Sequence, residues 1–176
     1  MLDVALTPPK VDNSKLSMSA SAKLRMRERE DPKAFYYDDG GRPGRGNCTW
    51  GIGILAHLGP CTSDELKKEV SATEIEASFA SRVGEAERIV RRRVSKQALT
   101  QDQFDALVSF TYNSGGRGAA KVLAYVDDGN FKAAASGISG AIYMTIRTKK
   151  GSKRVIARGL IPRRAEESAP FRNSVR

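Results

Sequence analysis

The chain has 176 residues, of which 40% are hydrophobic, enough for one domain or for a small domain with two lobes. No segment has the apolar run that a membrane-spanning helix needs, and Met1 to Leu16 lacks the apolar core of a secretory signal. The formal net charge of +10 favours an anionic partner but selects no reaction.

The N-terminal part of the chain is predicted to begin as a tail. Residues 1–15 show no periodicity, so we expect a flexible tail there and a single domain over residues 16–176. The spacing of apolar residues predicts a helix from Leu16 to about Glu30. The helix is expected to end there because Pro32 disfavours the helical conformation in the residue before it. Glu30 therefore lies at or near a helix C-terminus. The expected apolar face of this helix comprises Leu16, Ala20 and Leu24.

A hairpin is predicted next. Two runs rich in aromatic and β-branched residues, Phe35–Tyr37 and Cys48–Leu55, flank a bend rich in glycine, proline and asparagine at Asp38–Asn47. We expect this to be the only β segment and the rest of the chain to be helical.

The remaining helices follow from capping signals and apolar stripes. Thr62 with Glu65 and Ser71 with Glu74 have capping-box spacing, and Thr100 can cap a further helix. The strongest helix spans 71–94, and its apolar stripe is Ile75, Phe79, Val83, Ala86, Val90 and Val94. Other stretches are predicted as follows: a helix stop at Gly115-Gly116, helices at 119–126 and 131–144, an exposed loop at 149–153, and a last helix at 163–167 with Pro162 in its first turn.

Together these elements predict an α+β fold, with a small β-hairpin lobe, a larger helical lobe and the active-site cleft between them. Glu30 ends a helix, Asp39 begins the bend of the hairpin, and Thr49 begins the returning strand. Cleavage of a glycosidic bond needs a carboxylic acid for the leaving oxygen and a second group that holds water or stabilises the cationic transition state. The negative end of the helix dipole favours the protonated form of Glu30, and the Thr49 hydroxyl can hold a water molecule.

Three blocks of this sequence resemble the phage-type lysozymes and endolysins of glycoside hydrolase family 24. The first runs from Glu30 to Asp39 and continues at Asn47–Gly53, with the family's spacing of eight residues between glutamate and aspartate and with Tyr37 two residues before the aspartate. The second, Leu99–Asn113, is similar to the family's Asp-Ala-Leu-Val-Ser-Phe-x-Phe-Asn helix. The third, Arg158–Glu166, is similar to its Gly-Leu-x-x-Arg-Arg-x-x-Glu ending.

The resemblance implies a lysozyme-like fold and hydrolysis of the β-1,4 bond between N-acetylmuramic acid and N-acetylglucosamine in peptidoglycan. It implies Glu30, Asp39 and Thr49 as catalytic residues and peptidoglycan glycan strands as the partner, with no cofactor and no metal. We expect a monomer that is made in the host cytoplasm without a signal peptide. It would reach the wall in the periplasm after holin-type release and act there in host-cell lysis by a phage or prophage.

Two positions depart from the family pattern. Asp31 stands where a glycine usually follows the acid, and the loop between Asp39 and Thr49 is longer than usual. Asp38 is therefore an alternative to Asp39, and Glu28 is a weaker alternative to Glu30. His57 is expected to be a structural hydrogen-bonding residue.

Three other functions compete with hydrolysis. A cysteine peptidase would use Cys48 or Cys61 with His57 as base, and these cysteines can form a disulfide or remain thiols. A non-hydrolytic lytic transglycosylase would need the acid without the pair that holds water. A nucleic-acid-binding protein would use the basic charge, most of all the ten Lys or Arg residues in 145–176, but no nucleic-acid motif accompanies them. We expect that basic region to contact the anionic envelope and no specific nucleic acid.

Overall fold

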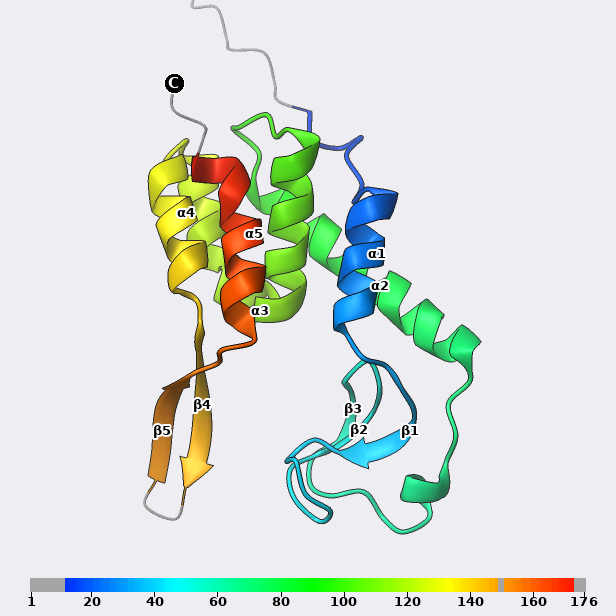
Figure 1. The fold of residues 1–176 in the computed structure, drawn as a ribbon. Coiled ribbons are helices and arrows are strands. Elements are labelled where there is room, and N and C mark those ends of the chain that lie inside the picture. The colour runs from blue at the N-terminus through cyan, green and yellow to red at the C-terminus, as the bar shows by residue number, and fades with distance from the viewer. Residues whose placement is uncertain (1–11, 149–150, 173–176) are drawn as a thin grey trace, which may run out of the picture. The chain divides into compact units, whose positions relative to one another are not determined.

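A computed structural model describes residues 12–148 and 151–172. The chain forms two compact units. One is made of residues 19–85, and the described part of the other is made of residues 12–18, 86–148 and 151–172. Helices and two small antiparallel sheets alternate along the described chain (Figure 1), which confirms the predicted α+β class. In the described part of the chain, no helix is both long enough and apolar enough to span a bilayer.

The unit of residues 19–85 contains one helix, a three-stranded sheet and a short 3-10 helix, and it ends within α2. Its elements are α1 (Ala20–Arg29), β1 (Lys33–Asp38), β2 (Cys48–Gly51), β3 (Ile54–His57), η1 (Glu65–Lys67) and the first part of α2 (Ala72–Arg93). The strands pair antiparallel in the order β1-β2-β3. The predicted hairpin is thus present, with one more strand than expected.

The face of α1 that is buried differs from the predicted one. The Ser19 hydroxyl caps the helix by accepting the N–H of Ala22, and the buried side chains are Ala22 and Met26, one turn apart. Leu24 lies between them in sequence and therefore about half a turn away, and its side chain is 61% exposed. The prediction of Leu24 as a core residue was wrong.

The other unit is built around α3. After the second part of α2 come α3 (Gln101–Asp127), α4 (Phe131–Gly140), β4 (Tyr143–Thr148), β5 (Gly151–Ile156) and α5 (Leu160–Arg172). All six stripe residues predicted for α2 are buried. A capping box of Thr100 and Gln103 begins α3, and the predicted stop at Gly115 is a kink after which the helix continues.

The β4–β5 hairpin was not predicted, because 131–144 was expected to be helical and 149–153 to be a loop. Helix α4 ends at Gly140, and β-branched and aromatic residues then favour an extended chain on both sides of the turn. The two strands pair in register from Tyr143 with Ile156 to Thr148 with Gly151. In Figure 1 the hairpin extends away from α3, α4 and α5, which pack against one another.

The expected N-terminal tail falls mostly outside the described residues, since residues 1–11 are not among them. Asn13 does not behave as part of a tail. Its side chain is 5% exposed, donates to the carbonyls of Val94 and Gln97, and accepts the N–H of Leu99. These bonds satisfy backbone groups at and after the end of α2, so Asn13 is part of the packed structure.

Candidate active site

Glu30 occupies the position that the sequence predicts. It is the C-cap of α1, it is partly buried, and its backbone N–H donates to the carbonyl of Arg27. Asp31 follows with a φ of 39°, the left-handed conformation that commonly ends a helix, and Pro32 prevents the helix from continuing. Glycine would adopt this positive φ without strain, because it has no Cβ. Glu28, the alternative acid, lies on the exposed part of the last turn.

The register of β1 with β2 separates the two adjacent aspartates. Tyr37 pairs with Thr49 and Asp38 pairs with Cys48, and the pairing continues beyond the strands where Asp39 N–H donates to the Asn47 carbonyl at 3.0 Å. Because side chains alternate between the two faces of a sheet, Asp38 lies on the face opposite Tyr37 and Thr49. Asp39 is the first residue after β1, at the position where the alternation returns to the face of Thr49.

The hydrogen bonds of Asp38 show that it holds the loop. Its Oδ1 accepts the N–H of Cys61 at 2.7 Å, and its Oδ2 accepts the N–H of Gly44 at 2.6 Å. Both carboxylate oxygens are therefore bound to backbone groups. The sequence did not indicate this role, because the partners are 6 and 23 residues away along the chain.

Asp39 is bound through one oxygen. Its Oδ1 accepts the N–H of Asn47 at 2.7 Å, and a Cβ added to Gly46 would clash with the same oxygen. The loop therefore folds closely around Asp39, which is exposed to solvent at the turn. The position of Asp39 at the bend was expected, but this backbone support was not.

Thr49 is 4% exposed, and its Oγ1 donates to the Tyr37 carbonyl at 3.1 Å. Since the hydroxyl proton is committed to this bond, the oxygen lone pairs remain as acceptors for a water molecule. The bond to the neighbouring strand holds the Thr49 side chain in place.

A disulfide between Cys48 and Cys61 anchors β2 directly beside Thr49. Cys48 N–H donates to the Gly59 carbonyl, and Gly59 N–H donates to the Asn47 side chain. The disulfide, a backbone hydrogen bond and a side-chain hydrogen bond thus all join the start of β2 to residues 59–61. A thiol nucleophile is therefore not available at either cysteine, which argues against the cysteine peptidase.

His57 has a structural role. Its Nδ1 bonds to the Leu58 carbonyl at 3.0 Å, and its Nε2 lies 3.1 Å from a carboxylate oxygen of Glu65 in η1. The Leu58 carbonyl first, and Glu65 second, raise the pKa of His57. The Thr62 backbone N–H, together with His57, lowers the pKa of Glu65 to about 2. His57 and Glu65 also lie near Cys48, with donor atoms within 4.8 Å of one another, but the Cys48 sulfur is bonded to Cys61.

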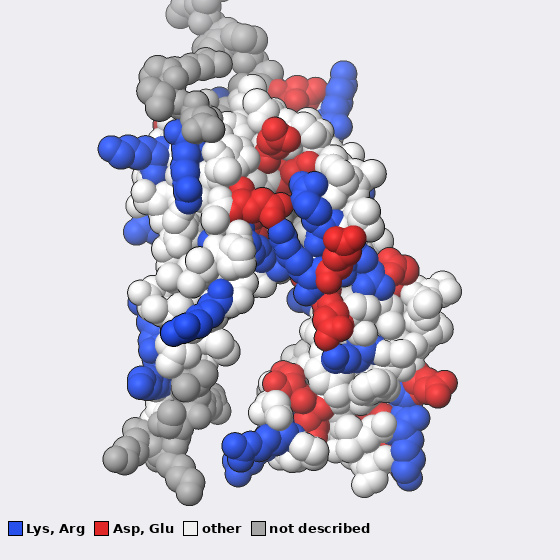
Figure 2. Space-filling model, viewed as in Figure 1, with Lys and Arg blue, Asp and Glu red and all other residues white. Residues whose placement is uncertain are grey.

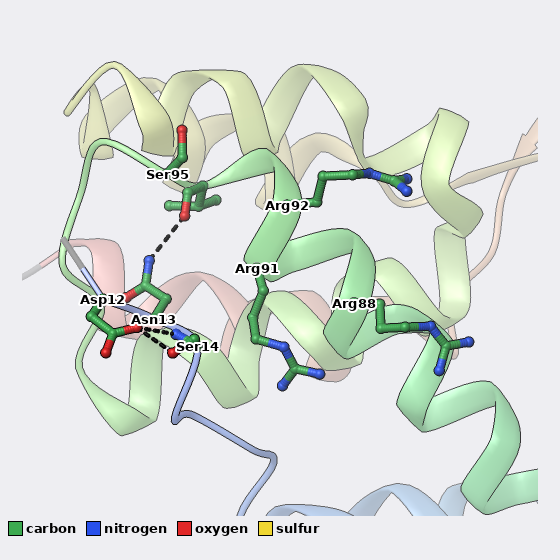
Figure 3. A pocket seen from close by; sticks show the side chains of 8 residues that line it. Asp12, Asn13, Ser14, Arg88, Arg91, Arg92 and Ser95 are labelled. Carbon is green, nitrogen blue, oxygen red and sulfur yellow. Dashed lines mark hydrogen bonds between the residues drawn. The ribbon is translucent and has the colours of Figure 1, made fainter. Parts of the chain in front are cut away.

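Two cavities in the described chain lie outside the candidate site. One of about 310 Å³ is lined by Phe35, Tyr36, Tyr37, Asp38, Gly41, Arg42, Pro43 and Leu66. The other, of about 750 Å³, lies in the helical unit (Figure 3) and is lined by Asp12, Asn13, Ser14, Arg88, Arg91, Arg92, Val94 and Ser95. Neither is lined by Glu30, Asp39 or Thr49.

The third resemblance block forms a buried ionic cluster. Glu167 is 2% exposed and accepts from Arg163 at 3.0 Å and from Arg164 at 2.6 Å. Arg164 also donates to Asn113 and to the carbonyl of Ala141. Two of the ten basic residues expected to face an anionic envelope are therefore buried in the protein. The spacing Gly-Leu-x-x-Arg-Arg-x-x-Glu makes Glu167, and not Glu166, the glutamate of this motif.

Comparisons with known proteins agree with this architecture. A family model described as phage lysozyme matches residues 30–167, whereas no curated protein matches the sequence. The muramidase domain of SpmX from Asticaccaulis excentricus is a similar solved structure, with 24% identity, a TM-score of 0.66 and coverage of 89% of this chain and 98% of that one. The endolysin of Escherichia coli O157:H7 phage FAHEc1 has 24% identity and a TM-score of 0.69, covering 92% and 96%. A mutant of P22 lysozyme has 21% identity and a TM-score of 0.59, covering 90% and 99%.

Proposed function

Because the chain belongs to the phage lysozyme family and is therefore a glycoside hydrolase that degrades bacterial cell walls, we propose the bond that it cleaves. This is the β-1,4 bond between N-acetylmuramic acid and N-acetylglucosamine in peptidoglycan. The observation that carries the proposal is that the family match begins at Glu30 and includes Asp39 and Thr49. The register that sets Asp38 on the face opposite Thr49 supports Asp39 as the partner of Thr49 in holding the water that hydrolysis requires.

In the proposed reaction Glu30 is the general acid and Asp39 the general base. Glu30 gives its proton to the leaving glycosidic oxygen as the bond from that oxygen to the anomeric carbon breaks. A water molecule donates one hydrogen bond to Asp39 and one to Thr49 Oγ1, and its oxygen attacks the anomeric carbon. Asp39 takes the proton that this water loses. Attack by water on the opposite face inverts the anomeric configuration of the product.

The first test is an analysis of the fragments released from purified peptidoglycan. Wild-type protein should release fragments with reducing muramic acid ends. Glu30→Gln should release these fragments at a rate at least about 100-fold lower, because general acid catalysis is lost. Glu28→Gln is the matched control and should retain activity. An unchanged digestion by Glu30→Gln contradicts the assignment, and anhydro-muramic ends from the wild type identify a lytic transglycosylase instead.

A second test separates the two aspartates. Asp39→Asn should lower kcat by about 100-fold or more with little loss of stability, because the amide oxygen still accepts the Asn47 N–H. Asp38→Asn should instead lower the thermal midpoint, since an amide offers one acceptor oxygen for two N–H donors. The reverse pattern would make Asp38 the second catalytic carboxylate.

The biological role that we propose is lysis of the host cell by a phage or prophage. The protein would reach the wall through a holin-type leak and act there on glycan strands as a monomer. Lysis of an induced culture should then require both this chain and a membrane-permeabilising partner. Lysis by this chain alone, expressed in the cytoplasm, would contradict the need for such a leak.

A further inference from the structure

The β4–β5 hairpin stands out as a surface that the proposed reaction does not use. A two-stranded hairpin alone is only marginally stable in water, and this one pairs chiefly with itself. Three of its apolar side chains are about half exposed: Tyr143 (46%), Met144 (50%) and Ile156 (51%). Their exposed area would be removed from water by contact with an apolar partner.

The charge around this hairpin has one sign. From Gly129 to Ala165 the sequence contains nine Lys or Arg residues and no Asp or Glu. Within the described part, Lys153, Arg154 and Arg158 are exposed and form no ion pair with another described residue. In Figure 2 the coloured part of this hairpin shows Lys and Arg atoms with no Asp or Glu atoms next to them. By contrast, Arg163 and Arg164 are buried against Glu167 and cannot serve an external partner.

The register places apolar and basic side chains together on each of the two faces of the hairpin. Tyr143 pairs with Ile156 and Thr145 pairs with Arg154, so Tyr143, Ile156 and Arg154 share one face of the hairpin. The Arg154 guanidinium lies 4.2 Å from the centre of the Tyr143 ring. Met144 and Val155 form the corresponding pair on the other face, with Lys153 beside them.

We propose that this hairpin binds the surface of a bilayer that contains anionic phospholipids. Each Lys or Arg near such a surface is attracted by the lipid phosphates, and a tyrosine with neighbouring aliphatic side chains suits the boundary between headgroups and acyl chains. A charged polymer such as nucleic acid would use the cations but would not need the exposed Met144 and Ile156. The hairpin would hold the protein at the membrane next to the wall, independently of the proposed hydrolysis.

The test measures sedimentation with vesicles of phosphatidylcholine alone or mixed equally with phosphatidylglycerol, at about 0.1 M salt, where surface charges still act over about 10 Å. Glu30→Gln serves as the parent protein, so that the result does not depend on catalysis. It should bind the anionic vesicles and not the neutral ones. Lys153→Gln/Arg154→Gln should bind about 30-fold more weakly, since each cation contributes about 1 kcal/mol.

The matched control removes the same charge elsewhere in the helical unit. Arg88 and Arg92 are exposed and lie one turn apart on α2 (Figure 3), so Arg88→Gln/Arg92→Gln changes the net charge equally. This variant should keep most of the parent's affinity for the anionic vesicles. An equal loss in both variants would show attraction by net charge alone and would overturn the assignment to the hairpin.

A third variant tests the lipid against other anions. Met144→Ser/Ile156→Ser keeps every charge and should weaken binding to anionic vesicles while leaving elution from a heparin column unchanged. Circular dichroism checks that each variant is folded. As a second check, each substitution is placed in the protein with wild-type Glu30, and its hydrolysis of soluble wall fragments is measured. Unaltered vesicle binding by this variant, or binding of the parent to neutral and anionic vesicles alike, would overturn the proposal.

Discussion

At the scale of single residues, the site is determined by short-range choices that the sequence reveals only in part. The order of Glu30, Pro32 and Asp39 predicts a helix end and a turn, and the structure confirms the helix end. Which of two adjacent aspartates faces Thr49 depends on the register of β1 against β2, and a shift of one residue would exchange them. That register cannot be predicted from the sequence, because the loop between the two strands is long and does not fix which residues pair.

Asp31 is expected to cost stability. Its φ of 39° is unfavourable for a residue with a Cβ, and its salt bridge with Lys33 is exposed and therefore weak. Asp31→Gly should raise the free energy of unfolding by about 0.5–1 kcal/mol, and Asp31→Ala should lower it, as measured by urea denaturation. Equal stability of the glycine and alanine variants would show that the left-handed turn stores no strain.

Glu167 is expected to be among the most sensitive charged residues. Replacing it with glutamine would leave Arg163 and Arg164 buried without a carboxylate, and breaking a buried ionic cluster in this way costs about 3–5 kcal/mol. Glu166→Gln, at the exposed neighbouring position, should change stability by less than about 0.5 kcal/mol. Chemical denaturation of the two variants compares them directly, and similar midpoints would contradict the role of the cluster.

At the scale of elements, local capping signals were reliable and helix faces less so. Thr62 with Glu65 and Ser71 with Glu74 form the reciprocal bonds predicted for them, because such bonds need only residues three apart. Thr100 caps α3 as predicted, and Gln103 completes its capping box, which was not predicted. The β4–β5 hairpin was not predicted. No strong helix-ending signal separates its apolar residues from the preceding helix, and apolar and polar residues alternate only weakly along its strands. Its pairing is a contact between residues up to 13 positions apart, which periodicity does not report.

The link between β3 and η1 predicts a pH dependence of stability. The raised pKa of His57 means that its contribution is present below the unfolded pKa of about 6.5 and is lost as the pH rises through the folded value. The pKa of Glu65, lowered to about 2, gives a contribution that is present above about 4.5 and is lost as the pH falls toward 2. Stability should therefore be greatest between these two limits.

Urea midpoints measured across this pH range check the prediction. In His57→Gln the fall in stability above about pH 6.5 should be reduced relative to wild type, because the titrating imidazole is gone. Retention of the full wild-type profile by this variant would show that another group carries the effect.

At the scale of the whole molecule, the fold class and the family follow from the sequence, whereas the distribution of charge does not. Three motifs in order were sufficient to identify the family, because each combines residue type with spacing, and the family match over residues 30–167 confirms it. The sum of charges gave +10, but Arg163 and Arg164 are turned inward. Burial decides which charges a partner meets, and burial depends on tertiary packing.

The net charge predicts a salt effect that differs between substrates. Hydrolysis of intact anionic walls should slow several-fold between about 0.05 M and 0.5 M salt, because screening weakens the attraction of a protein with a charge of +10. Hydrolysis of short uncharged oligosaccharides of N-acetylglucosamine is the control and should change little. The same salt dependence for both substrates would place the effect in the catalytic site.

The β4–β5 hairpin also bears on how copies of this chain behave toward one another. A two-stranded ribbon has two open edges, each with backbone donors and acceptors that could recruit a strand from a neighbouring molecule. Lysine and arginine along such edges oppose this, because two like-charged ribbons repel before their backbones can pair. We therefore expect the charges of this ribbon to oppose pairing between copies of this chain, and we expect modifications that neutralise them to favour precipitation.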